Sequence, residues 1–198
     1  MGYLKSIKTP IFNAEGMEKV DLPDSSAYFV EIGGNTDKKG NYLLKDLFGL
    51  FQRKVVNRRL TSVSRFSVRA EWSGISWQDF VAWANPYNYR YVYFESYKKY
   101  VTVVEKDDMN NDGIVICDMV NNEPIEFEYG GPLRMFIPNL WGYKSCKWLK
   151  RIFFIDEYIV GFWESRGYDH RGLIEPCVLL DVNTGSFKKI KGGEVTDF

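Results

Sequence analysis

Short runs of aromatic and β-branched residues, each ended by Gly, Pro, Asn or Asp, recur along most of the chain and predict a fold built mainly from strands. Strands are expected at residues 27–32, 55–56, 60–70, 91–94, 100–104, 114–117, 125–127 and 133–138. Two short stretches, residues 43–51 and 78–84, have apolar side chains at helical spacing. The pattern therefore predicts an α+β fold, a mixed β-sheet with a few short helices.

The length of 198 residues suits a single domain over residues 1–198. Within it, residues 1–26 read as an irregular N-terminal segment, and residues 173–198 as a C-terminal extension with a hairpin turning at 183–185. The first residues contain no apolar run suited to a signal peptide, and the sequence has no stretch of about 18 apolar residues. We therefore expect a cytoplasmic protein without membrane contact.

Charge and histidine content exclude several classes of function. Lys and Arg number 26, as do Asp and Glu, so the chain lacks the basic excess typical of nucleic-acid binding. His170 is the only histidine, which excludes a His-rich metal site and paired histidine ligands to a haem. Residues 108–113 begin like a calcium-binding loop, but Met119 stands where the bidentate Glu belongs, so a polar turn is expected.

The three cysteines form no C-x-x-C pair, and their odd number does not suit a disulfide framework. Cys117 and Cys177 lie in apolar strands and are expected in the core. Cys146 stands between Lys144 and Lys147, and neighbouring cations lower a thiol's pKa. Cys146 is therefore either an activated thiol or an inert, half-buried one.

A polar cluster follows the strand expected at residues 133–138. Arg134, Lys144, Ser145 and Lys147 offer a guanidinium, two ammonium groups and a hydroxyl close to Gly142. Together with local backbone N–H groups, these could form a cradle for a phosphate or another anion. Ordinary charges at strand ends explain the same pattern equally well.

The order and spacing of five segments resembles the sulfite oxidase family of molybdopterin-dependent oxidoreductases. The segments are residues 94–96, 121–125, 130–138, 142–149 and 161–168. Residues 28–72 follow the family more loosely, so the resemblance covers most of the chain. It implies a sulfite-oxidase-like, mixed α+β domain that holds one molybdopterin with a molybdenum centre for oxygen-atom transfer.

The resemblance also implies site residues. Arg134 matches the arginine that contacts the cofactor. Ser145, Cys146 and Lys147 match the segment that surrounds its phosphate end, and Ser96 matches a small polar residue beside the pterin. Tyr129 stands where the family has a histidine or asparagine that reaches the pterin.

The resemblance fails at the metal ligand. The family binds molybdenum through the cysteine of a C-V-x-x-W-S pattern, and here Val68 has that spacing before Trp72. With one inserted residue, Ser67 takes the place instead and becomes the candidate ligand, although a hard alkoxide would change the metal's electronics. Residues 1–26 also contain no counterpart of the family's Arg-, His- and Asn-rich cofactor segment.

These departures favour a molybdopterin-binding oxidoreductase-like domain with a degenerate metal site, a cofactor-poor or non-catalytic family member. The alternative is an active cytoplasmic molybdenum oxidoreductase that uses Ser67. The sequence leaves open whether the chain is an enzyme. The ligands expected are a small anion or a pterin, together with a protein partner, and no haem.

Overall fold

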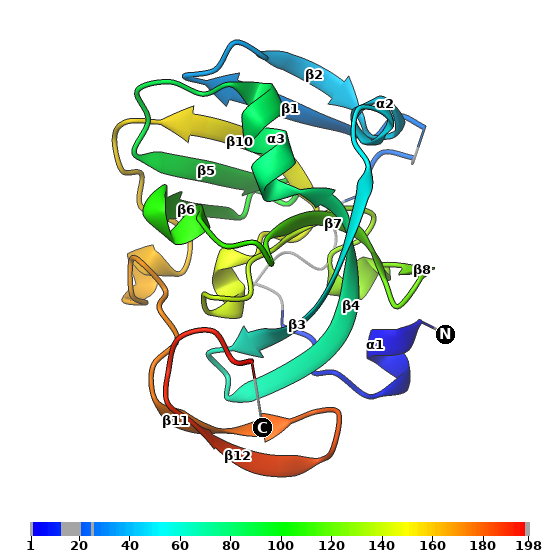
Figure 1. Ribbon diagram of the computed structural model, residues 1–198, viewed down its shortest axis with the longest axis vertical. Coiled ribbons are helices and arrows are strands. Elements are labelled where there is room, and N and C mark those ends of the chain that lie inside the picture. Colours follow the sequence, from blue (N-terminus) through cyan, green and yellow to red (C-terminus); the bar gives the residue numbers. More distant parts are fainter. Residues whose placement is uncertain (1, 13–20, 25, 197–198) are drawn as a thin grey trace.

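The computed structural model describes residues 2–12, 21–24 and 26–196, and its strands form two sheets. The first sheet occupies the upper part of Figure 1. Its strands lie in the order β2 (Gly40–Leu43), β1 (Phe29–Gly34), β10 (Leu149–Ile155), β5 (Tyr91–Ser96) and β6 (Val101–Glu105). β1 runs parallel to β10, and the other neighbours are antiparallel.

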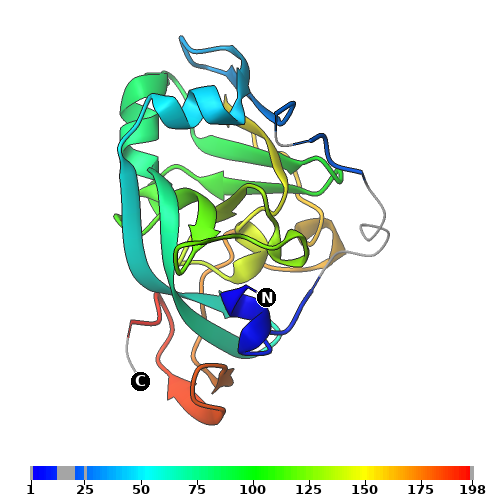
Figure 2. The same cartoon turned by 90° about the vertical axis from the view of Figure 1, so that its right-hand side faces the viewer.

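The second sheet is built around the long strand β4 (Phe66–Ser76), which pairs along its length with β3 (Arg53–Ser62) (Figure 2). Its order is β12 (Ser186–Ile190), β11 (Cys177–Asp181), β4, β7 (Val115–Val120) and β8 (Glu123–Pro124), with β9 (Arg134–Phe136) on β7. β11 and β12 are the hairpin expected from the sequence, at the bottom of Figure 1. β11 joins β4 in parallel through Leu180 and Asp181.

The helices are short: α1 (Tyr3–Ser6), α2 (Leu44–Gly49) and α3 (Trp77–Ala84), with 3-10 turns η1 (Asp107–Met109), η2 (Phe127–Tyr129), η3 (Gly142–Lys144) and η4 (Glu164–Arg166). Helix α3 packs on the first sheet, with the Trp77 ring 5.8 Å from that of Phe94. Among the described residues, no helix has the length and apolar character needed to cross a membrane.

Two apolar clusters lie on the two faces of β7. Ile116 belongs to the larger cluster under the first sheet, and its neighbour Val115 belongs to the second cluster, beside α1. β4 contributes Val68 to the second cluster and Ile75 to the first, because side chains alternate along a strand and the pairing of β4 with β3 is unbroken. A bulge at Asp118 of β7 changes which face the following side chains of β7 occupy.

The local predictions differ from the structure in several places. The strand predicted at 60–70 is interrupted by a turn, because β3 ends at Ser62 and β4 begins at Phe66. The strand predicted at 125–127 is wrong: β8 ends at Pro124, and residues 127–129 form η2. This turn is closed by Gly130, whose φ of 103° favours glycine, and whose N–H donates to the Phe127 carbonyl. The N-terminal segment, expected to be irregular, contains α1, which is held by buried Leu4.

A fully buried ion pair joins η3 to η4. The Lys144 ammonium donates to Glu164 Oε1 at 2.5 Å, to the Val103 carbonyl at 2.8 Å and to the His170 carbonyl at 2.6 Å. Both side chains are inaccessible to solvent. The pair therefore holds η3 and η4 together. Aromatic residues in and next to these two turns form one wall of a cavity.

Changing Glu164 to Gln should lower the free energy of unfolding by about 3–5 kcal/mol, because the Lys144 ammonium would stay buried without a carboxylate. Urea unfolding followed by tryptophan fluorescence measures the change. The matched control is Asp156→Asn, which breaks the exposed pair with Arg90 and should leave stability nearly unchanged. Equal, small effects of both variants would contradict the structural role of the buried pair.

Candidate cofactor-binding cavity

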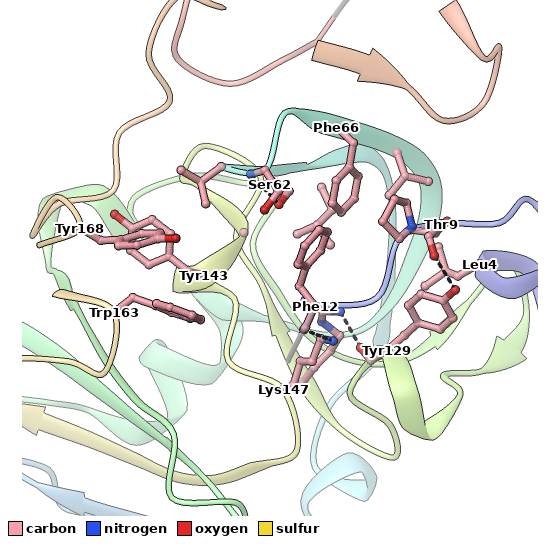
Figure 3. A pocket seen from close by; sticks show the side chains of 17 residues that line it. Leu4, Thr9, Phe12, Ser62, Phe66, Tyr129, Tyr143, Lys147, Trp163 and Tyr168 are labelled. Atoms are coloured by element: carbon pink, nitrogen blue, oxygen red, sulfur yellow. Dashed lines mark hydrogen bonds between the residues drawn. The ribbon is translucent and has the colours of Figure 1, made fainter. Parts of the chain in front are cut away.

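A cavity of about 180 Å³ opens between the N-terminal segment, the ends of β3 and β4, and the turns η2, η3 and η4. Figure 3 shows its two walls. Phe12, Phe66, Tyr129 and Lys147 lie on one side, and Tyr143, Trp163 and Tyr168 on the other. The described chain thus brings together residues that are far apart in the sequence.

Arg134 lines the cavity and is 2% exposed. Its guanidinium donates to three carbonyl oxygens, those of Tyr129 at 2.6 Å, Met135 at 3.2 Å and Ser145 at 3.3 Å. It also lies 5.6 Å from the centre of the Trp72 ring. Burial lowers the pKa of Arg134, and among the described residues no carboxylate forms an ion pair with it. A buried cation held only by carbonyl dipoles is suited to an anionic ligand.

Lys147 lies in the same cavity. Its ammonium donates to the carbonyl oxygens of Phe12 at 3.0 Å and Glu128 at 2.9 Å. Burial, together with repulsion by Arg134 and Lys98, lowers the pKa of Lys147 to about 7, although the Glu128 carboxylate acts in the opposite direction. Two cationic groups therefore share a weakly solvated site.

Tyr129 also lines the cavity, and its hydroxyl donates to the Thr9 carbonyl at 2.8 Å. Burial raises the pKa of Tyr129, so its phenol is neutral and can donate a hydrogen bond. Beside it, the Thr9 hydroxyl is buried and has no hydrogen-bond partner among the described residues. An unsatisfied buried hydroxyl at a cavity is a candidate ligand contact.

The side chains of Lys144, Ser145 and Cys146 face the protein interior. The Ser145 hydroxyl accepts from the Ile137 N–H at 3.0 Å, and only its carbonyl reaches Arg134. Cys146 lies in the larger apolar cluster, and burial raises the pKa of its thiol well above the ordinary value. This geometry corresponds to the inert alternative for Cys146. Lys144, considered as part of an anion cradle, is instead engaged by Glu164.

Ser96 is buried at the end of β5, outside the residues that line the cavity. Its hydroxyl accepts from the N–H groups of Lys98 and Tyr100, each at 3.0 Å, and so closes the turn between β5 and β6. Lys98 lies between the Phe127 and Trp148 rings, 4.6 and 4.5 Å from their centres. In this structure Ser96 therefore shapes a turn near Lys147 and does not face the cavity.

Val68 and Ser67 occupy opposite faces of β4. Val68 lines the cavity with Arg134, whereas the Ser67 hydroxyl is 3.0 Å from that of Thr61. Ser67 also pairs in register with Asp181 of β11, whose carboxylate accepts from Arg59 at 2.9 Å. The side chain at the cavity has no donor atom, and the hydroxyl of its neighbour lies among other polar groups.

Sequence reasoning missed the aromatic wall of the cavity and the N-terminal contribution. Tyr168 contacts Tyr143 and Trp163, with ring centres 5.3 and 5.0 Å apart. These residues fall inside two of the segments that carried the family resemblance, but no individual role was assigned to them. Phe12 stacks on Phe66 at 5.7 Å, and no local pattern indicates a contact between residues so distant in sequence.

The donor set fits the anionic part of a ligand better than a metal ion. Arg134, Lys147, Tyr129 and Thr9 line the cavity, and each carries a hydrogen-bond donor group. Among the described residues, no group of three or more His, Cys, Asp or Glu side chains is placed to hold a metal. At about 180 Å³, the cavity is also smaller than the roughly 300–1,000 Å³ usual for small-molecule sites.

Comparison with known proteins places these features in a family context. A putative protein-methionine-sulfoxide reductase subunit, YedZ1, from Azospira oryzae is 26% identical over 163 residues, which cover 81% of this chain and 62% of the relative. The uncharacterized oxidoreductase YuiH of Bacillus subtilis is 38% identical over 82 residues, 41% of each chain. The chain thus spans less than two thirds of the length of either relative.

Among solved structures, the sulfane dehydrogenase SoxCD from Paracoccus pantotrophus superposes with a TM-score of 0.65 at 16% identity, covering 88% of this chain and 47% of that one. This likeness confirms the α+β, sulfite-oxidase-like fold. The family model described as "Oxidoreductase molybdopterin binding domain" matches residues 17–163, which is most of the chain. The chain therefore belongs to the oxidoreductase molybdopterin-binding domain family.

Proposed function

We propose that this domain binds a pterin-type anionic ligand in the cavity but supplies no protein ligand to molybdenum, and that it is a cofactor-poor or non-catalytic family member. The observation that carries the proposal is the position of Val68, an aliphatic side chain that lines the cavity beside Arg134. The cationic groups that attract an anion are present, while the side chain that should anchor a metal offers no donor.

The anionic part of molybdopterin fits the residues of this cavity. Arg134 and Lys147 would hold a phosphate by charge-assisted hydrogen bonds, and Tyr129 and Thr9 add neutral donors. Tyr143 and Trp163 offer aromatic surface to a flat ring system. The other three residues predicted to bind the cofactor would support the site indirectly. The Ser145 carbonyl orients Arg134, and Cys146 packs in the larger apolar cluster. Ser96 shapes the turn that contains Lys98.

The metal does not fit in the same way. Molybdenum bound to molybdopterin supplies oxygen-atom transfer, and a soft, charged thiolate ligand suits such a centre. Val68 cannot replace that ligand, and the Ser67 hydroxyl is engaged by Thr61 on the opposite face of β4. The role of Ser67 as a ligand stays a prediction that this geometry does not favour, and we derive no catalytic step through the metal.

A partner protein fits this proposal. The relative from Azospira oryzae is described as a subunit of a reductase, and the matched region covers only 62% of that relative. We propose that the domain likewise works as part of a larger assembly. A cytoplasmic location stays a prediction from the sequence.

Protein purified from a host that makes the molybdenum cofactor should contain far less than stoichiometric molybdenum. The loss of a ligand to the metal should weaken binding by more than the roughly 10–100-fold that indirect contacts contribute. Elemental analysis measures the metal content. Near-stoichiometric molybdenum that disappears in Ser67→Ala would overturn the proposal and support the active enzyme.

Restoring a thiolate at the cavity should restore metal binding. Val68→Cys should raise the molybdenum content above that of the unmodified protein, because its side chain lies at the cavity. Ser67→Cys is the matched control and should not, since that side chain faces Thr61. The same elemental analysis compares the two variants, and a gain limited to Ser67→Cys would assign the ligand position to residue 67.

Anion binding should weaken as the pH rises through the pKa of Lys147. With a pKa of about 7, Lys147 is mostly protonated at pH 6 and mostly neutral at pH 8, so the affinity for inorganic sulfate should fall up to about 10-fold between them. Arg134 keeps its charge over this range, and sulfate does not titrate. Isothermal titration calorimetry measures the affinity at both pH values.

Two variants control this experiment. Lys147→Met should remove the pH dependence. Lys150→Met, whose ammonium lies over the Tyr97 ring outside the cavity, should keep it. An unmodified protein that binds sulfate equally at pH 6 and pH 8 would show that Lys147 does not contribute its charge.

A further inference from the structure

We infer that residues 9–12 form a strap that closes the cationic cavity and competes with the anionic ligand for Lys147. The inference rests on the proposed function, because it assigns a means of regulation to the same site.

The Phe12 ring covers the cavity without being buried in it. It stacks on Phe66 with an angle of 17° between the rings and a distance of 5.7 Å between their centres. Phe66 is buried, whereas Phe12 keeps 54% of its surface exposed. In Figure 3 the Phe12 side chain lies between Phe66 and Lys147, over the cationic side of the cavity. A ring that stays half in water loses little when it is displaced.

The strap uses the hydrogen-bond donors that a ligand needs. The Phe12 carbonyl accepts from the Lys147 ammonium at 3.0 Å, and the Thr9 carbonyl accepts from the Tyr129 hydroxyl at 2.8 Å. Carbonyl oxygens carry only a partial charge, so an oxyanion is the stronger acceptor for an ammonium group. A bound anion and the closed strap therefore compete for the same donors.

The strap is anchored at its N-terminal side. Helix α1 inserts Leu4 into the second apolar cluster, where it is 1% exposed, and the Tyr3 hydroxyl accepts from Asn183 at 3.1 Å. Lys8, just before the strap, has a φ of 55°, a left-handed turn that separates the helix from residues 9–12. Displacement of the strap therefore requires no unfolding of α1, and the segment remains close to the cavity after it opens.

The strap also accounts for the small size of the cavity. Thr9, Pro10 and Phe12 are part of its lining, so the volume of about 180 Å³ is measured with the strap closed. Movement of these residues would enlarge the space next to Arg134 and Lys147. The same movement would leave the aromatic wall in place, because η3 and η4 are held by the buried pair of Lys144 and Glu164.

The test is calorimetric titration of the full chain at pH 6 with inorganic sulfate as the probe. Phe12→Ala should bind sulfate roughly 2- to 10-fold more tightly than the unmodified protein, the range that corresponds to the loss of one aromatic stacking contact. The matched control is Ile11→Ala. Ile11 is the exposed neighbour of Phe12, lies outside the cavity lining, and should leave the affinity unchanged.

Hydrogen–deuterium exchange supplies a second readout. Saturating sulfate should increase exchange in the peptide that contains residues 9–12. The strap is refuted if the unmodified protein binds sulfate and Phe12→Ala binds it no more tightly, or if sulfate instead protects residues 9–12. Absence of sulfate binding in every variant would refute the proposed anion site itself, and the strap with it.

Discussion

The arrangement around the cavity depends on keeping the Arg134 guanidinium away from water. A cation in such a place is costly unless its N–H groups are satisfied, and here three carbonyl oxygens converge on it. They belong to Tyr129 in η2, Met135 in β9 and Ser145 after η3. Each of these segments must present a carbonyl at one point, so the guanidinium determines how the turns around the cavity are placed.

Two of the buried cations among the described residues, Lys144 and Arg134, differ in what surrounds their charge. Lys144 has a carboxylate partner in Glu164, so its charge is neutralised within the protein. Arg134 has only dipoles, and Lys147 lies close enough to repel it. The Lys144–Glu164 pair stabilises the aromatic wall of the cavity, and its charge needs no further partner. The arrangement around Arg134 leaves positive potential in a poorly solvated space, which supports the proposed binding of an anion.

The sequence predicted the fold class, the position of most strands and the family, because strand runs and the five spaced segments are local patterns. It also brought Tyr129, Arg134 and Lys147 into one candidate site, and all three line the cavity. Neighbours of Lys147 in sequence were assigned to the same site, yet Ser145 and Cys146 face inward. Side-chain direction in an irregular turn is set by packing partners far away in the sequence, and no local pattern records it.

The contributions of Phe12 and of the Lys144–Glu164 pair were unpredictable for the same reason. Phe12 meets Phe66 and Lys147 only after the chain has folded, and its own surroundings in sequence are unremarkable. The sequence did name both candidates for the place of the family's metal-binding cysteine, Ser67 and Val68. The structure distinguishes them because their side chains leave β4 in opposite directions.

The register of β4 decides which of these two side chains lies at the cavity. Gly74 of β4 passes so close to β7 that an added Cβ would meet the Ile116 carbonyl, opposite a bulge at Asp118 of β7. Along β4, which pairs with β3 without a bulge, the side chains at residues 68 and 72 face the second cluster together. A shift of the strand by one residue would exchange the two faces and bring the serine hydroxyl to the cavity. The chemical character of this site is thus set by strand register as well as by residue identity, and a single insertion or deletion in β4 could convert one kind of site into the other without changing any side chain.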